Sequence, residues 1–417
     1  MREHGGAERW DERDLERRLC HALDIARRTV ERLAPAGYDG AAPDERVRPE
    51  KVIAETAMLL LAASTVDLPE VRARVDAAAR LLIPHARSER MLWALCVEPA
   101  LSLDYAAAHL CLQRIGYGDA ECDALLQQTL AGQAAGSRER PPHRMLEQAW
   151  LQRGGGVASA ARLSVLARPM DLLGGSRDDV YAFTHALMYV TDFNIAPARL
   201  PRRRAAILAD AEGALARCLD DQDYDLGGEV LLAWPLTGNS WSPAAAFAFR
   251  VLARAEDQAG FLPAPVTRID RIKELDGDRR GDYLLATAYH TIYVMGLVCA
   301  AALRDGRTPP ATIPAAPRAR RGSAKRMLDL IGDDGRELQW REELMELDER
   351  QRDALSEMLL AIALCRRVKQ RDFGGVAEVL RAGDALGLTD TPVASQSAEL
   401  LERIALFAEL TRVTRTA

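Results

Sequence analysis

Apolar positions recur every three or four residues along nearly the whole chain, which is the spacing of a helix with one buried face. Alternation of apolar and polar residues with a period of two, the pattern of a strand, never persists for five residues. Helix boundary signals are clear: Ser176 with Asp179 forms a capping box, Ser242 precedes Pro243, and Gly260 follows an apolar run. The pattern predicts an all-α fold of about fifteen helices.

The helices that this pattern predicts are short and their connections are mostly brief, so we expect antiparallel helix hairpins. The chain has no short repeat, which disfavours a solenoid and favours an α/α toroid or an incomplete barrel of hairpins. We expect a toroid-like body over residues 1–305 and a Pro-, Ala- and Arg-rich linker or long loop over 306–325. Residues 326–417 then form a C-terminal helical segment packed on the body, with one long helix at roughly 342–368.

A polar stripe runs through YAFTHALMYVTDF, residues 181–193. Tyr181, His185, Tyr189 and Asp192 are spaced by four, four and three residues, so a continuous helix presents them on one face. A purely apolar neighbourhood would leave several hydrogen-bonding groups without partners. The stripe therefore indicates a polar cavity.

Two further apolar stretches carry isolated ionisable groups. Asp225 and Glu229 lie one turn apart in residues 220–236, and Tyr283, Thr287 and His290 share one side of residues 283–303. In a toroid, the inner helices would bring His185, Asp192, Glu229 and His290 to one cavity. A shared proton-transfer site requires that the two imidazoles lie within about 12 Å of each other.

Residues 232–243, LAWPLTGNSWSP, join two apolar helices through Trp234, Trp241 and two prolines. A rigid aromatic loop of this kind suits the rim of a pocket. The alternative is a helix hairpin whose tryptophans seal the core.

Histidine beside carboxylate favours acid–base catalysis, because imidazole both takes and gives a proton near neutral pH. In this hypothesis His185, His290, Asp192 and Glu229 are catalytic. The residues predicted to bind substrate are Tyr181, Tyr189, Asp225, Trp234, Trp241, Tyr283 and Thr287. Two alternatives stay open: buried core histidines that merely satisfy hydrogen bonds, and a metal site, which lacks HxxxH or HExxH support. We expect no metal and no cofactor.

Composition narrows the class of protein further. With 417 residues, 48% hydrophobic residues, 28% charged residues and a net charge of −6, the chain has the composition of an ordinary globular protein with no pull toward nucleic acid or anionic membranes. The longest uncharged run, 231–249, contains Pro235 and Pro243 and so does not suit a membrane span. The charged N-terminal residues lack the apolar core of a signal peptide, so we do not expect export. Seven dispersed cysteines argue against a disulfide framework. We expect a cytoplasmic protein.

The blocks THALMYVTDF, DLGGEVLLAWPL, WSPAAAFAFRVLARAEDQAGFLP and AYHTIYVMGL resemble those of an uncharacterised actinobacterial family of helical proteins often found among natural-product gene clusters. The resemblance implies tailoring of a peptide or small molecule. Our leading hypothesis is a cofactor-independent tailoring enzyme, of the lyase, cyclase or hydrolase type, that acts on a peptide or other natural-product intermediate. The alternative is a non-catalytic protein that binds a peptide or a partner enzyme of a biosynthetic complex.

Overall fold

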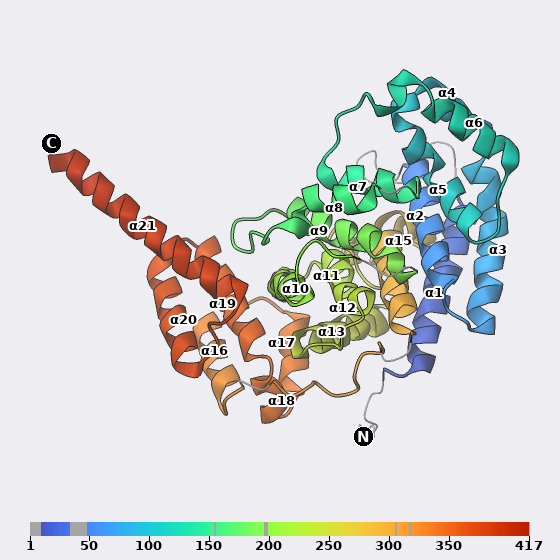
Figure 1. The fold of residues 1–417 in the computed structure, drawn as a ribbon. Helices are drawn as coiled ribbons and strands as arrows, with labels where there is room; N and C mark the ends of the chain where they lie inside the picture. The colour runs from blue at the N-terminus through green and yellow to red at the C-terminus, as the bar shows by residue number, and fades with distance from the viewer. Residues whose placement is uncertain are drawn as a thin grey trace, which may run out of the picture.

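The computed structural model describes residues 10–33, 48–153, 156–195, 199–304, 307–316 and 319–416. Every regular element within these ranges is a helix, and none of the described residues belongs to a strand (Figure 1). The predicted all-α class is confirmed for this part of the chain.

The body and the C-terminal segment together contain the following helices. The first part of the body comprises α1 (Glu12–Glu31), α2 (Pro49–Ala63), α3 (Pro69–Ala86), α4 (Glu89–Val97), α5 (Ser102–Arg114), α6 (Ala120–Leu130), α7 (Pro142–Leu151), α8 (Val157–Leu163) and α9 (Arg177–Val190). The second part comprises α10 (Arg204–Asp220), α11 (Tyr224–Leu231), α12 (Ala233–Thr237), α13 (Pro243–Ala259), α14 (Ile269–Glu274) and α15 (Gly277–Ala302). The C-terminal segment comprises α16 (Ser323–Ile331), α17 (Gln339–Met345), α18 (Glu349–Asp353), α19 (Ser356–Lys369), α20 (Phe373–Leu386) and α21 (Pro392–Thr416). Short 3₁₀ helices are η1 (Pro99–Leu101), η2 (Gln133–Gly136), η3 (Val165–Ala167) and η4 (Asp192–Asn194).

The predicted helix boundary signals occur where the sequence indicates them. Ser176 and Asp179 form a reciprocal capping box at the start of α9. Ser242 caps α13 with Pro243 in its first turn, and Gly260 ends that helix with a φ of 79°, a left-handed conformation that glycine adopts without strain. These caps fix the ends of two helices that border the site region and the core.

Six helices form a closed series in which each helix packs on the next and the last packs on the first: α2, α15, α11, α9, α7 and α5. We call this set the inner ring. Other helices pack on members of this set: α1 and α3 pack on α2, α10 and α13 pack on α11, and α8 packs on α7 and α9. The ring brings into proximity side chains that are far apart in the sequence.

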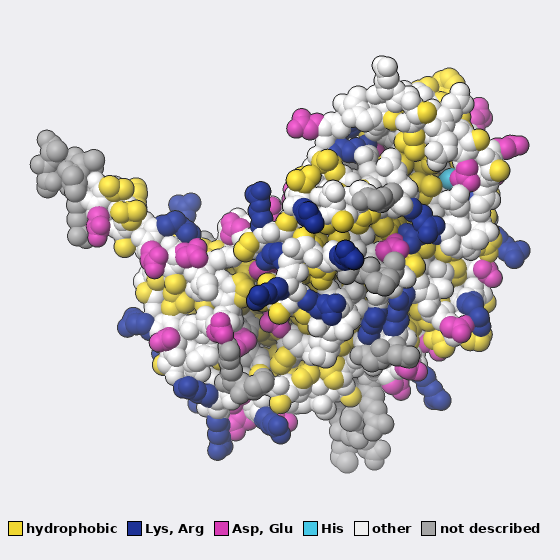
Figure 2. Space-filling model, viewed as in Figure 1, with side chains coloured by type: hydrophobic (Ala, Val, Ile, Leu, Met, Phe, Trp, Pro, Cys, Tyr) yellow, Lys and Arg dark blue, Asp and Glu magenta, His cyan; other side chains and the backbone are white. Residues whose placement is uncertain are grey.

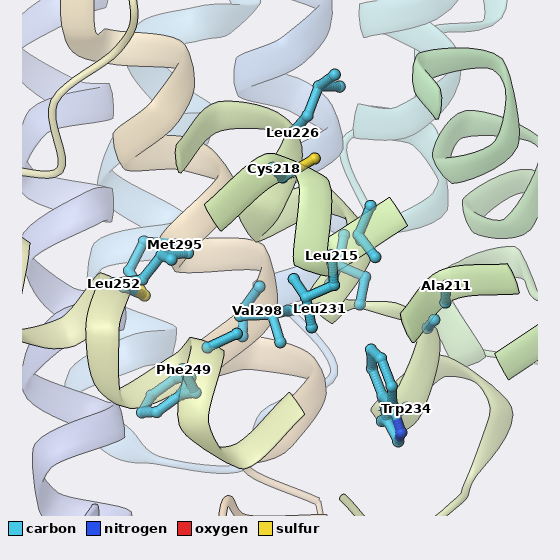
Figure 3. Close-up of a cluster of buried hydrophobic side chains, with 14 of the residues drawn as sticks. Ala211, Leu215, Cys218, Leu226, Leu231, Trp234, Phe249, Leu252, Met295 and Val298 are labelled. Carbon is cyan, nitrogen blue, oxygen red and sulfur yellow. The ribbon is translucent and has the colours of Figure 1, made fainter. Parts of the chain in front are cut away.

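Apolar packing holds the second half of the body together. Figure 3 shows side chains from α10, α11, α12, α13 and α15 meeting in one cluster, among them Leu215, Leu231, Phe249 and Val298. Among the described helices, α15 alone is long and apolar enough to cross a membrane, but 83% of its apolar stretch is buried inside the protein. Burial of this extent is what a core helix of a folded domain shows.

The C-terminal segment packs on the body through α19 and α21 against α10 and through α17 against α13. The single helix predicted at roughly 342–368 is wrong, because α17, α18 and α19 occupy that region. Asp348 and Gln351 form a capping box that starts α18 and interrupts the apolar periodicity. Beyond these contacts α21 extends away from the rest of the chain, and Leu406, Phe407 and Leu410 are exposed on it (Figures 1 and 2).

Candidate functional site

A cleft of about 700 Å³ opens between α2, α5, α7 and α9 of the inner ring. Its lining includes Glu55 from α2, Glu147 from α7, and Tyr181, His185 and Tyr189 from α9. The three α9 residues are the first three members of the predicted polar stripe. The stripe therefore faces a cavity over this length.

Glu229 of α11 lies between the two predicted histidines. Its Oε1 atom is 3.7 Å from Nε2 of His185 and 3.8 Å from Nε2 of His290, whereas its Oε2 atom accepts a hydrogen bond from Thr184. The two Nε2 atoms are thus separated by no more than these two distances together, well inside the limit of about 12 Å for a shared proton-transfer site. Glu229 is only 2% exposed, so both imidazoles meet a buried carboxylate.

His290 of α15 is held by carboxylates on both ring nitrogens. Its Nδ1 lies 2.7 Å from Oδ1 of Asp225, and its Nε2 lies 3.6 Å from Oε1 of Glu55. Arg177 donates a hydrogen bond of 2.9 Å to the other oxygen of Asp225, and Thr291 donates one of 3.1 Å to Oδ1. Asp225 therefore connects Arg177 at the surface to the partly buried imidazole.

The charges on these groups set the protonation state of His290. Burial opposes a charge on the imidazole, but Asp225, Glu55 and Glu229 outweigh it and raise the pKa of His290 to about 10. Burial likewise opposes the charge of Asp225, yet His290 and Arg177 hold the pKa of that carboxyl well below its usual range. At neutral pH His290 is consequently an imidazolium that donates hydrogen bonds.

His185 has a different set of partners. Its Nδ1 lies 3.3 Å from the hydroxyl of Tyr189, which donates its one hydrogen to Glu147 over 2.8 Å. Nδ1 must therefore be the donor to Tyr189, and in the neutral imidazole this leaves Nε2 as an acceptor facing Glu229. Burial and Glu147 raise the pKa of Tyr189 well above its usual value, so this side chain stays a phenol.

Neighbouring groups fix the orientation of this second set. Arg144 donates a hydrogen bond of 2.7 Å to Glu147 and one of 3.4 Å to the hydroxyl of Tyr181. The ring of Tyr181 stacks on His185 with centroids 3.9 Å apart. The His185 side chain is 10% exposed, so packing and hydrogen bonds together restrict its rotation.

Asp192 does not join the cluster, contrary to the prediction. Helix α9 ends at Val190, and Asp192 has a φ of 50°, so the helical periodicity no longer applies to it. Its carboxylate accepts hydrogen bonds of 2.6 and 2.8 Å from Arg114 and one of 2.6 Å from the indole of Trp150. A different carboxylate lies beside His290, that of Asp225, which was predicted to bind substrate.

The predicted aromatic rim and the first residues of α15 also lie elsewhere. Trp234 is 1% exposed within the core cluster of Figure 3, and the indole of Trp241 donates a hydrogen bond of 2.6 Å to the carbonyl of Arg307. The hydroxyl of Tyr283 accepts from the backbone of Arg268 at 3.2 Å, and Thr287 donates to the carbonyl of Tyr283. None of these four predicted residues is among the described residues that line the cleft. The tryptophans seal the core, as the alternative interpretation had it.

Several residues of the site escaped the sequence analysis. They are Glu55, Arg144, Glu147, Arg177 and Thr184. One of them had a usable signal: Glu55 is the sole ionisable residue in VIAETAMLLLAA, residues 52–63. A carboxylate in so apolar a helix indicates a specific partner, which the structure provides in Tyr289 at 2.7 Å.

Across the described ranges, the histidine, cysteine, aspartate and glutamate side chains form no group of three or more arranged to hold a metal ion. In this cluster imidazole nitrogens of both His185 and His290 face carboxylates. The arrangement brings the His290 imidazolium and Nε2 of His185 to one carboxylate, that of Glu229.

Fold and site together define an all-helical protein with a histidine–carboxylate cluster, of which His185 and Glu55 line a cleft. Residues 19–300 match a family described as a domain of unknown function, DUF6895, and the chain belongs to this family. The match runs from α1 to nearly the end of α15 and so includes the inner ring. Comparisons with curated proteins and with solved structures gave no match. Membership of an uncharacterised family is confirmed, whereas the actinobacterial origin and the gene-cluster context stay predictions.

Proposed function

We propose that the protein is a cofactor-independent acid–base enzyme, of the lyase, cyclase or hydrolase type, acting in the cytoplasm on a peptide or small natural-product intermediate. One observation carries the proposal: His185 and His290 face the same buried carboxylate, Glu229, in complementary hydrogen-bonding roles. A core histidine needs one or two hydrogen bonds and no cleft.

The two imidazoles have different parts in this proposal. Neutral His185 takes a proton from the substrate at Nε2, while Tyr189 and Glu147 hold the ring and stabilise the imidazolium that forms. His290, already charged, donates from Nε2 to negative charge that develops on the substrate. Glu229 lies between them and favours each charged imidazole in turn.

The architecture supports a cavity enzyme. We propose that the inner ring is the inner layer of an incomplete α/α barrel, with α1, α3, α8, α10 and α13 as parts of an outer layer. The support is the closed series of helix contacts and the contacts that other helices make with its members. In such a barrel the inner helices supply the reacting groups and the outer helices supply stability.

The second candidate function is non-catalytic binding of a peptide or of a partner enzyme. This function is supported by the walls of the cleft, which combine apolar side chains such as Leu101 and Met58 with charged ones such as Arg48 and Arg138. A peptide presents the same mixture. A binding protein, however, has no need of the two differently protonated imidazoles.

Untargeted substrate discovery tests the proposal. The purified full chain is incubated with peptide and small-molecule extracts of the source organism, and the changes are followed by mass spectrometry. We expect wild type to consume one or more compounds. We expect His185→Gln and Glu229→Gln to consume the same compounds at least 100-fold more slowly, in line with the roughly 10²–10⁴-fold contribution of a general acid or base. His85→Gln and Glu402→Gln, which lie outside the cleft, are the matched controls and should act as wild type.

The binding alternative gives another result in the same experiment. A compound retained by wild type and by His185→Gln to the same extent, with no compound consumed, would replace the enzyme proposal by the binding one.

A further inference from the structure

We propose that the gap between His185 and Glu229 receives a primary ammonium group of the substrate, as found at the amino terminus of a peptide or on an alkylamine. The inference rests on the proposed function and names the substrate group that this same site recognises.

The first reason is that two hydrogen-bond acceptors face each other. In the neutral form that the proposed function gives to His185, its Nε2 is an acceptor that lies 3.7 Å from Oε1 of Glu229. Neither atom has a hydrogen-bond partner among the described residues, and the nearest cation to Oε1 is His290 at 3.8 Å. Both side chains are at least nine-tenths buried, so little of either is open to solvent. A group placed between two acceptors must donate two hydrogens, which an ammonium group does and a substrate hydroxyl does not.

The second reason is charge. The connected network contains five carboxylates and four permanent or raised-pKa cations: Asp223, Asp225, Glu229, Glu55 and Glu147 against Arg177, His290, Lys51 and Arg144. Among the described residues, this network of ion pairs thus carries one net negative charge. A proton on His185 would match it, but a base must be neutral before it reacts. An ammonium group supplies the missing positive charge and leaves His185 neutral.

The third reason is the surface around the gap. The rings of Tyr181 and Tyr189 border His185 in the cleft, and aromatic faces attract a desolvated cation. The cleft volume of about 700 Å³ accommodates several residues of a peptide beyond the ammonium group.

The chemistry that follows is a single balanced proton transfer. One N–H bond of the ammonium group breaks and one N–H bond forms at Nε2 of His185. The electron pair released on the substrate nitrogen makes it a nucleophile.

Titration of the full chain with benzylamine and with benzyl alcohol tests the inference, because the two probes share a shape and differ in charge. We expect benzylamine to bind wild type at least tenfold more tightly than benzyl alcohol, and Glu229→Gln to abolish that preference. Glu402→Gln on exposed α21 is the control and should keep the preference. If Glu229→Gln does not fold by circular dichroism, His185→Phe removes the other acceptor and should lower benzylamine affinity at least tenfold.

Equal affinity for the two probes would overturn the inference. A second result would also overturn it: chelator-treated protein binds zinc tightly from zinc chloride, the zinc displaces benzylamine, and Glu229→Gln no longer binds zinc. The cation that the site receives would then be a metal ion. The proposed function fails separately: if benzylamine binds as expected but no extract compound is consumed, the ammonium site stands without an enzyme. If extract compounds are consumed in a His185-dependent way but benzylamine does not bind, the enzyme stands without the ammonium site.

Discussion

At the scale of single residues, the two histidines of the site have different hydrogen-bonding roles because they have different partners. His290 contacts three carboxylates and keeps its proton, whereas His185 has the phenol of Tyr189 at one nitrogen and a single carboxylate, Glu229, at the other. Sequence spacing cannot show this difference, because the partners come from α2, α7 and α11. The division into donor and acceptor is therefore a property of the fold.

The raised pKa of His290 makes stability depend on pH. Since its pKa rises from 6.5 to about 10 on folding, the folded state holds the proton more tightly than the unfolded chain. This contribution is fully present below pH 6.5 and is lost as the pH rises through about 10. We expect the melting temperature of wild type to fall more steeply over this interval than that of His290→Gln, as scanning calorimetry at a series of pH values will show. Parallel curves for the two proteins would contradict the assigned charge.

The sequence predicted part of this site for physical reasons that can be stated. His185, Glu229 and His290 stand out because ionisable groups in apolar helices need partners, and these three do meet. Asp192 was misassigned because the helix was extended one turn too far, past its end at Val190. Arg177 and Glu147 lie in sequence contexts that resemble an ordinary solvated helix face, so their roles depend on contacts across the ring.

At the scale of elements, the close approach of α11 to α15 positions Asp225 and Glu229 against His290. Gly228 permits it: a Cβ there would lie 2.6 Å from Cγ1 of Val294, closer than real contacts allow. The neighbouring Gly227 has room, because its Cβ would lie 3.6 Å from Cβ of Cys218. The pair offers a test of helix spacing that touches no reacting group.

We expect Gly228→Ala to cost about 1–3 kcal/mol of folding stability through overpacking and to weaken any activity or ligand binding. Gly227→Ala should leave stability unchanged or slightly raised, because alanine favours a helix interior. Chemical unfolding of both variants measures the difference. Equal stabilities would mean that α11 and α15 separate without cost, so their spacing would not set the site.

The helix boundaries illustrate what patterning predicts at this scale. Caps at Ser176, Ser242 and Gly260 were predictable because each satisfies helix-end groups locally. The break at Asp348 was missed because apolar residues continue at helical spacing on both sides of it. Trp234 was misplaced for a related reason, since an aromatic residue beside a turn suits a rim and a core equally well.

At the scale of the whole molecule, the C-terminal segment packs behind the body through α10 and α13 rather than across the cleft. The stretch before it is partly anchored: the carbonyl of Arg307 accepts from Trp241, and Arg320 donates to the carbonyl of Ala385. The side chain of Arg321 is 88% exposed, so the predicted linker is accessible at this residue.

Limited proteolysis with trypsin should cut first at Arg320 or Arg321, because an exposed non-helical segment enters a protease readily. The arginine-to-glutamine double variant at these positions is the control and should delay the first cut. Mass spectrometry identifies the site. A first cut within α9 or α15 would contradict the packing of the inner ring.

The most direct measurement is ¹H–¹⁵N NMR of the histidine side chains in wild type and in Glu229→Gln. If His185 and His290 share one site centred on Glu229, the imidazole resonances of both must shift in the variant. His109, whose Nε2 lies 2.7 Å from Asp123 in another part of the body, should keep its resonances. A variant that folds normally while either His185 or His290 keeps its wild-type resonances would show that the two imidazoles do not share the site.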